Sequence, residues 1–123
     1  MKKYLKYILT LIILLPTLSF THPASDIKIK YDIENSKVEI EVLHSVRDPN
    51  DHYIYEVDIL LNNKNIIKQF ASAQISNKEQ RLVYIIPGLK YSDKIEIITE
   101  CNKGGKIKKL FVIEKNGKKS KEE

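Results

Sequence analysis

The clearest fold signal in this chain is the stretch Val38-Glu39-Ile40-Glu41-Val42. Apolar and acidic side chains alternate in it with a period of two, which is typical of a β-strand with one buried face and one solvated face. We therefore expect Val38, Ile40 and Val42 to enter a hydrophobic core, while the two glutamates between them face water.

Strand signals of the same kind recur along the chain after residue 26, and no segment has a convincing helical pattern. Turn signals separate them, among them Asn62-Asn63-Lys64, Pro87-Gly88 and Lys103-Gly104-Gly105. The spacing predicts an all-β fold, specifically an immunoglobulin-like antiparallel β-sandwich of about seven strands. The expected strands cover residues 27–31, 38–42, 53–61, 66–70, 80–86, 95–99 and 107–113.

The two ends of the chain differ in composition from the part between them. Residues 1–21 combine a basic start with an apolar run broken at Pro16, which is typical of a secretory signal peptide. The run is shorter than the roughly 20 apolar residues that a membrane span requires, so no permanent span is expected. Residues 115–123 predict a basic disordered tail. Residues 22–114 remain as one domain, which we expect to be exported to the periplasm or secreted.

The predicted domain is close to neutral. The first 21 residues hold three of the 21 basic side chains and none of the 16 acidic ones, and the tail holds four lysines and two glutamates. Nucleic-acid binding by a folded domain requires a basic stripe on one face. The predicted strands offer no such stripe, so we expect no nucleic-acid partner.

The candidate metal ligands are the three histidines and the single cysteine, namely His22, His44, His52 and Cys101. A lone cysteine cannot form an internal disulfide, which leaves a buried inert thiol, an intermolecular bridge or a metal thiolate. His44 is expected to close one strand and His52 to open the next. Cys101 ends a strand that can reach the same place. We therefore expect these side chains at one end of the sandwich.

Three segments carry a resemblance to a known family, namely His44-Ser45, Asp51-His52-Tyr53-Ile54 and Cys101-Asn102-Lys103-Gly104-Gly105. In this order they are similar to the His-Pro, Glu-His-Tyr-Ile and Cys-Asn-x-His-Gly motifs of the desulfoferrodoxin and neelaredoxin family, the superoxide reductases. The resemblance covers about residues 22–114. The chain departs from the family at Gly104, which stands where the last motif has a histidine, and in a longer interval between the first two segments.

The resemblance implies a metal site and an activity. His44 and His52 would be equatorial ligands of a mononuclear non-haem iron, and Cys101 would be its axial thiolate. His22, which precedes the first strand, would take the place of the family's first histidine. The implied function is an exported enzyme that reduces superoxide by one electron, supplied by an external electron donor. The alternative, favoured by Gly104, is a non-catalytic periplasmic binding or carrier module that has lost the metal site and binds a protein partner.

Overall fold

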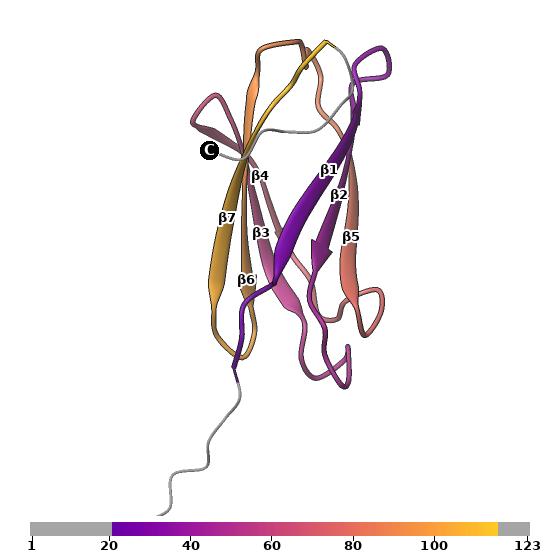
Figure 1. Cartoon of the computed structure of the whole chain (residues 1–123), viewed down its shortest axis with the longest axis vertical. Coiled ribbons are helices and arrows are strands. Elements are labelled where there is room, and N and C mark those ends of the chain that lie inside the picture. Colours follow the sequence, from indigo (N-terminus) through magenta and orange to yellow (C-terminus); the bar gives the residue numbers. More distant parts are fainter. Residues whose placement is uncertain (1–20, 116–123) are drawn as a thin grey trace, which may run out of the picture.

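The computed structural model describes residues 21–115, which form two antiparallel sheets packed face to face (Figure 1). One sheet has the order β1-β2-β5 and the other the order β4-β3-β6-β7. The predicted all-β sandwich of seven strands is therefore confirmed. The strands are β1 (Asp26–Asp32), β2 (Lys37–Leu43), β3 (Ile54–Leu61), β4 (Lys64–Phe70), β5 (Glu79–Ile85), β6 (Lys94–Cys101) and β7 (Lys106–Val112).

Parts of the predicted signal peptide and tail lie outside the described residues. Of the expected signal, residues 1–21, only Thr21 is described, and of the expected tail, residues 115–123, only Lys115. Within residues 21–115 there is no helix long and apolar enough to cross a membrane.

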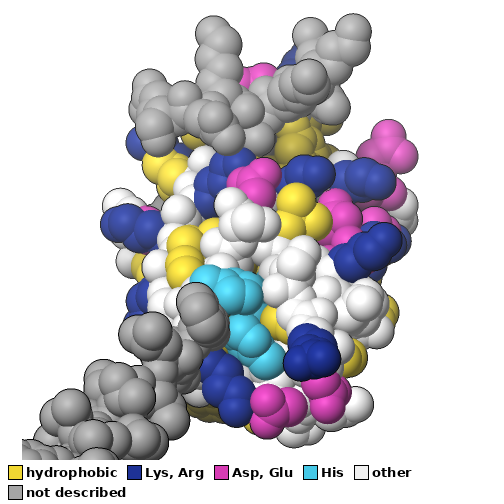
Figure 2. Space-filling model, turned by 60° about the horizontal axis from the view of Figure 1, so that its bottom comes forward, with side chains coloured by type: hydrophobic (Ala, Val, Ile, Leu, Met, Phe, Trp, Pro, Cys, Tyr) yellow, Lys and Arg dark blue, Asp and Glu magenta, His cyan; other side chains and the backbone are white. Residues whose placement is uncertain are grey.

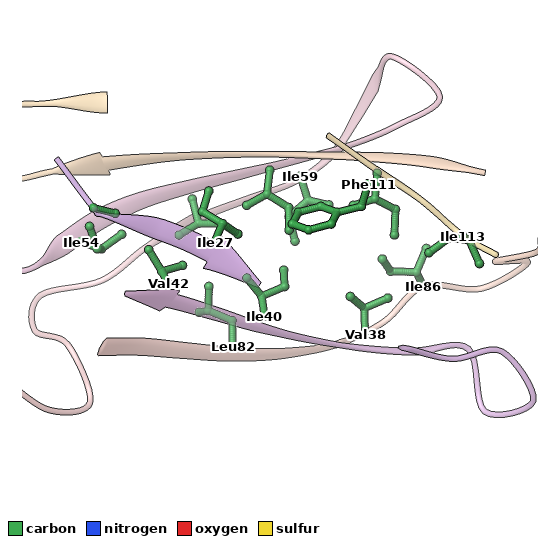
Figure 3. Close-up of a cluster of buried hydrophobic side chains, with 14 of the residues drawn as sticks. Ile27, Val38, Ile40, Val42, Ile54, Ile59, Leu82, Ile86, Phe111 and Ile113 are labelled. Atoms are coloured by element: carbon green, nitrogen blue, oxygen red, sulfur yellow. The ribbon is translucent and has the colours of Figure 1, made fainter. Parts of the chain in front are cut away.

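The core lies between the two sheets and follows the alternation of the strands. Val38, Ile40 and Val42 are each 0% exposed, as the sequence pattern predicted. Figure 3 shows them in one layer with Ile59 and Phe111 of the other sheet. Full burial of such a side chain contributes about 1.5–3 kcal/mol. This layer fixes the two sheets against each other and therefore fixes the loops at both ends.

The antiparallel order determines which loops meet. Asp26 pairs with Leu43, and Ile54 pairs with Cys101, so β1 and β3 begin at the end of the sandwich where β2 and β6 finish. Figure 1 shows this end at the bottom of the view. We call it the histidine end and the opposite one the far end. Residues 21–25, 44–53, 71–78 and 101–105 form the histidine end, and residues 33–36, 62–63, 86–93 and 113–115 form the far end.

Candidate metal centre

The structure brings all four predicted ligands to the histidine end. His22 precedes β1, His44 follows β2, His52 precedes β3, and Cys101 is the last residue of β6. Figure 2 shows histidine side chains adjacent to one another at this end, with charged side chains around them. The prediction that His44, His52 and Cys101 share one end of the sandwich is confirmed, and His22 lies at the same end.

The three imidazoles form a compact cluster. Their ring centroids are 4.8–4.9 Å apart in every pairing. One ring nitrogen from each of His22, His44 and His52 lies within 4.8 Å of the others. Three nitrogen ligands at this spacing can bind one ion after small side-chain movements. His44 is fully buried.

Cys101 joins the cluster through His52. Its sulfur lies 3.0 Å from Nε2 of His52, and the residue is only 2% exposed. The backbone N–H of Lys103 donates to the same sulfur over 3.4 Å. In the metal-free protein the thiol can donate its proton to His52. A metal ion would replace that proton, because only the thiolate is a strong ligand.

Asn102 fixes the cysteine hairpin against the loop that carries His52. Its side-chain oxygen accepts from the backbone N–H of Tyr53 at 2.9 Å, and its amide nitrogen donates to the carbonyl of Asp51 at 2.8 Å. Its backbone N–H also donates to the carbonyl of Tyr53 at 3.0 Å. These three hydrogen bonds span His52 on both sides. They set the distance between its ring and the sulfur.

His22 reaches the cluster because Gly105 has no side chain. A Cβ at Gly105 would lie 2.6 Å from the backbone nitrogen of Pro23, closer than Cβ atoms approach in proteins. The φ of Gly105 is +101°, a value that residues with side chains rarely adopt. The segment that carries His22 therefore packs directly on the hairpin that follows Cys101. Gly104 makes no comparable contact, since a Cβ there would meet only the side chain of Thr21 at 3.7 Å or more.

Gln74 supports His44 and was not among the predicted site residues. It lies between β4 and β5, is 6% exposed, and its side-chain oxygen is 2.9 Å from Nδ1 of His44. Its backbone N–H donates to the carbonyl of Pro49 at 3.1 Å. The sequence gives no local signal for this role, because the contact joins residues that are far apart in the chain. Only the fold identifies it.

The surroundings of His52 favour its neutral form. Burial is the main cause that lowers the pKa of this imidazole below its usual value. The neighbouring His44 and His22 rings lower it further, as does the ammonium of Lys103, while the Asp51 carboxylate opposes them. A neutral ring has a free nitrogen lone pair, which is the form that binds a metal ion.

Comparison with known proteins gives no match. No family model matches this chain, and no curated protein is significantly similar to it.

Proposed function

We propose that the protein is an exported, superoxide reductase-like domain that binds one non-haem iron on an immunoglobulin-like sandwich. The single observation that carries this proposal is the cluster of three imidazoles at one end of the fold, with the sulfur of Cys101 in contact with one of them, the ring of His52. The four side chains are the complete set of histidines and cysteines in the sequence, namely His22, His44, His52 and Cys101.

The spacing of two donor atoms is compatible with binding to one ion. With a metal–nitrogen bond of about 2.1 Å and a metal–sulfur bond of about 2.3 Å, two ligands of one ion are about 3.1–3.6 Å apart. The separation between Nε2 of His52 and the sulfur of Cys101 is 3.0 Å. Binding by these two atoms would therefore require little movement of either side chain.

The chemistry of the donors also fits iron. Imidazole is a common ligand of ferrous iron, and a thiolate increases electron density on the metal. When bound, ferrous iron would supply the electron that, with two protons, converts superoxide into hydrogen peroxide, and an external electron donor would then restore the ferrous state. Four protein ligands leave room for a small anion beside them.

The residues of this chain have distinct parts in the proposal. His22, His44 and His52 hold the ion as neutral imidazoles. Cys101 binds as a thiolate, and the N–H of Lys103 that points at its sulfur moderates the electron donation. Asn102 holds the hairpin that follows Cys101 against the loop that carries His52.

A second candidate function rests on Gly104. The residue has a φ of +107°, a conformation that a histidine rarely adopts, so this turn is not shaped for the histidine of the resembled motif. That favours a binding or carrier module without a metal, acting through a protein partner. Alkylation of Cys101 does not separate the two functions, because its 2% exposure shields the sulfur in either case.

Metal content and the visible spectrum decide between them. We would purify the exported protein without chelator and compare it with Cys101→Ser and with the control Thr99→Val. Thr99 is buried on the same face of β6, and its hydroxyl has no hydrogen-bond partner among the described residues. We expect about one iron per chain and a thiolate-to-iron absorption band that is lost in Cys101→Ser but kept in Thr99→Val. We also expect the reduced protein to consume superoxide. A colourless, iron-free protein whose stability does not depend on Cys101 would favour the carrier module.

A further inference from the structure

A buried amide lies against the one fully buried histidine of the cluster. His44 is 0% exposed and Gln74 is 6% exposed, so water does not compete for the contact between them. Nδ1 of His44 is 2.9 Å from Oε1 of Gln74. A neutral imidazole has one N–H and one lone pair, and the partner of each nitrogen determines which is which.

The orientation of the Gln74 amide follows from its other neighbours. Its nitrogen is 2.8 Å from the carbonyl oxygen of His44 and 2.8 Å from that of Ser76, and both oxygens can only accept. Its oxygen is 3.3 Å from the backbone N–H of Ile54, which can only donate. Turning the amide over would place like groups against one another at all three contacts. The atom that faces His44 is therefore an acceptor.

Both ring nitrogens of His44 face an acceptor, but the contact of Nδ1 with Gln74 is the shorter, at 2.9 Å against 3.3 Å for Nε2, so the geometry places the proton on Nδ1. Its Nε2 then carries the lone pair and lies on the side of His22, whose carbonyl oxygen is 3.3 Å away. Two acceptors face each other there, and no described donor lies between them. A cation between the two acceptors would stabilise that arrangement. A second proton, on Nε2, would instead give a charged ring in a fully buried position.

We propose that Gln74 is a positioning residue that selects the Nδ1–H tautomer of His44 and so leaves Nε2 free to bind the metal. The tautomer is a property of the metal-free chain, while its consequence for a metal rests on the function proposed above. With the proton already on Nδ1, the buried ring neither turns over nor loses a proton when the ion binds. Such supporting hydrogen bonds typically change metal affinity 10–100-fold.

Gln80 provides a matched control for Gln74. It is 7% exposed and supports the same loop, since its amide nitrogen donates to the carbonyl of Ala73 at 3.1 Å and its oxygen accepts from the N–H of Ile75 at 3.2 Å. None of its hydrogen bonds reaches a histidine. Gln74→Met and Gln80→Met should therefore weaken the loop in similar ways, but only Gln74→Met removes the acceptor beside Nδ1.

The first measurement is the tautomer of His44 in the metal-free protein. Two-bond proton–nitrogen correlation spectra of the full chain, labelled with 15N-histidine at neutral pH and assigned with His44→Ala, should show the Nδ1–H form in the unsubstituted protein and in Gln80→Met. In Gln74→Met the proton should move to Nε2, where it can donate to the carbonyl of His22. A ring that carries its proton on Nε2, or on both nitrogens, in the unsubstituted protein would overturn the inference, and this holds even if Gln74→Met fails to fold.

The second measurement is the affinity for cobalt(II), whose thiolate absorption reports binding at Cys101. We expect the dissociation constant of Gln74→Met to exceed that of Gln80→Met by 10–100-fold. Equal constants for the two variants would refute the positioning role. Absence of cobalt binding to the unsubstituted protein would refute the proposed metal function, together with this consequence of the tautomer. The spectra of the metal-free chain decide the tautomer itself, so the two failures are distinguishable.

Discussion

The two ends of the sandwich each bury a polar side chain, but they treat it differently. At the far end Asp93 is 3% exposed, and its carboxylate accepts from the side-chain amide of Asn62 and from the backbone N–H of Lys90, each at 2.9 Å. The oxygen of Asn62 accepts in turn from the N–H of Lys94 at 2.9 Å. Donors and acceptors match throughout, so this network has a structural role.

At the histidine end the hydrogen bonds do not balance in the same way. The side-chain oxygen of Gln74 is an acceptor beside Nδ1 of His44, and Nε2 of the same ring faces a second acceptor, the carbonyl of His22. Nε2 of His52 and the sulfur of Cys101 contact each other, and Nδ1 of His22 is 3.2 Å from the carbonyl oxygen of Pro23. Burial of polar groups alone therefore does not indicate a ligand. What distinguishes the histidine end is that three imidazoles and a thiol lie together there, and that one fully buried ring has an acceptor beside each of its nitrogens.

The strongest test of this contrast is metal removal. If the histidine end binds a metal ion, free metal at 100 times the dissociation constant should raise the free energy of unfolding by about 2.7 kcal/mol, because the unfolded chain lacks the site. Denaturant titrations with and without a chelator would measure the difference. It should nearly vanish in Cys101→Ser and persist in Asp93→Asn. A chelator effect of the same size in both variants would show that the stabilising ion binds elsewhere.

The converse prediction concerns the far end. Asp93→Ala removes the charged acceptor of the Asn62 amide and of the Lys90 N–H, and we expect it to lower the free energy of unfolding by about 2 kcal/mol. Its metal affinity should stay that of the unsubstituted protein, since Asp93 lies at the opposite end of the sandwich. Chemical denaturation and cobalt titration would measure the two quantities.

Asp51→Ala is the matched control for that variant. Asp51 is exposed, and among the described residues its side chain pairs with Lys103 alone, at the surface and at 3.1 Å. Removing such a pair changes stability by less than about 1 kcal/mol. An Asp93→Ala variant that lost no more stability than Asp51→Ala would mean that the far-end network contributes little.

The fold could be predicted from the sequence because its signals are local. Alternation placed Val38, Ile40 and Val42 in the core, and two asparagines marked the hairpin between β3 and β4, where Asn62 and Asn63 adopt φ values of 49° and 68°. Such values suit the tight turn of a two-residue hairpin. The antiparallel order of the strands then brings the histidines and the cysteine to one end.

The supporting residues of the site could not be predicted, because their partners are remote. The acceptor that Gln74 presents to His44 depends on the folding of the loop between β4 and β5, and the need for Gly105 appears only once Pro23 lies on it. The start of β3 also departs from simple alternation. The pairing of β3 with β6 shifts between Ile54 and Glu56, so the residue between them lies in an irregularity that a period of two does not predict.

A smaller effect is expected from substituting Asn102 or Asn62. Each of these asparagines connects a turn to a neighbouring segment, Asn102 at the histidine end and Asn62 at the far end. Asn102→Ala removes both side-chain hydrogen bonds that fix the His52 loop, and we expect metal to bind about 10-fold more weakly. Asn62→Gly removes the corresponding amide at the far end and tolerates the positive φ there. It should lower stability without changing metal affinity. Equal losses of metal affinity in both variants would indicate a general loosening of the sandwich rather than a local role for Asn102.

The smallest expected effect is the pH dependence of the stability that Asp93 contributes at the far end. The amide of Asn62 is the main cause that holds the pKa of Asp93 below its usual value, with help from the N–H of Lys90 and against the effect of burial. A carboxyl whose pKa is lower in the folded state stabilises the fold fully above its unfolded pKa, near 3.9, and loses that contribution as pH falls through the folded value. The stability difference between the unsubstituted protein and Asp93→Asn, both free of metal, should therefore be constant from neutral pH to about 5 and shrink in stronger acid. Since both proteins keep the same histidines, their titration cancels in the comparison. A difference that grew on acidification would mean that Asp93 is already protonated in the folded state, and the far end would then resemble the histidine end in holding an unmatched group.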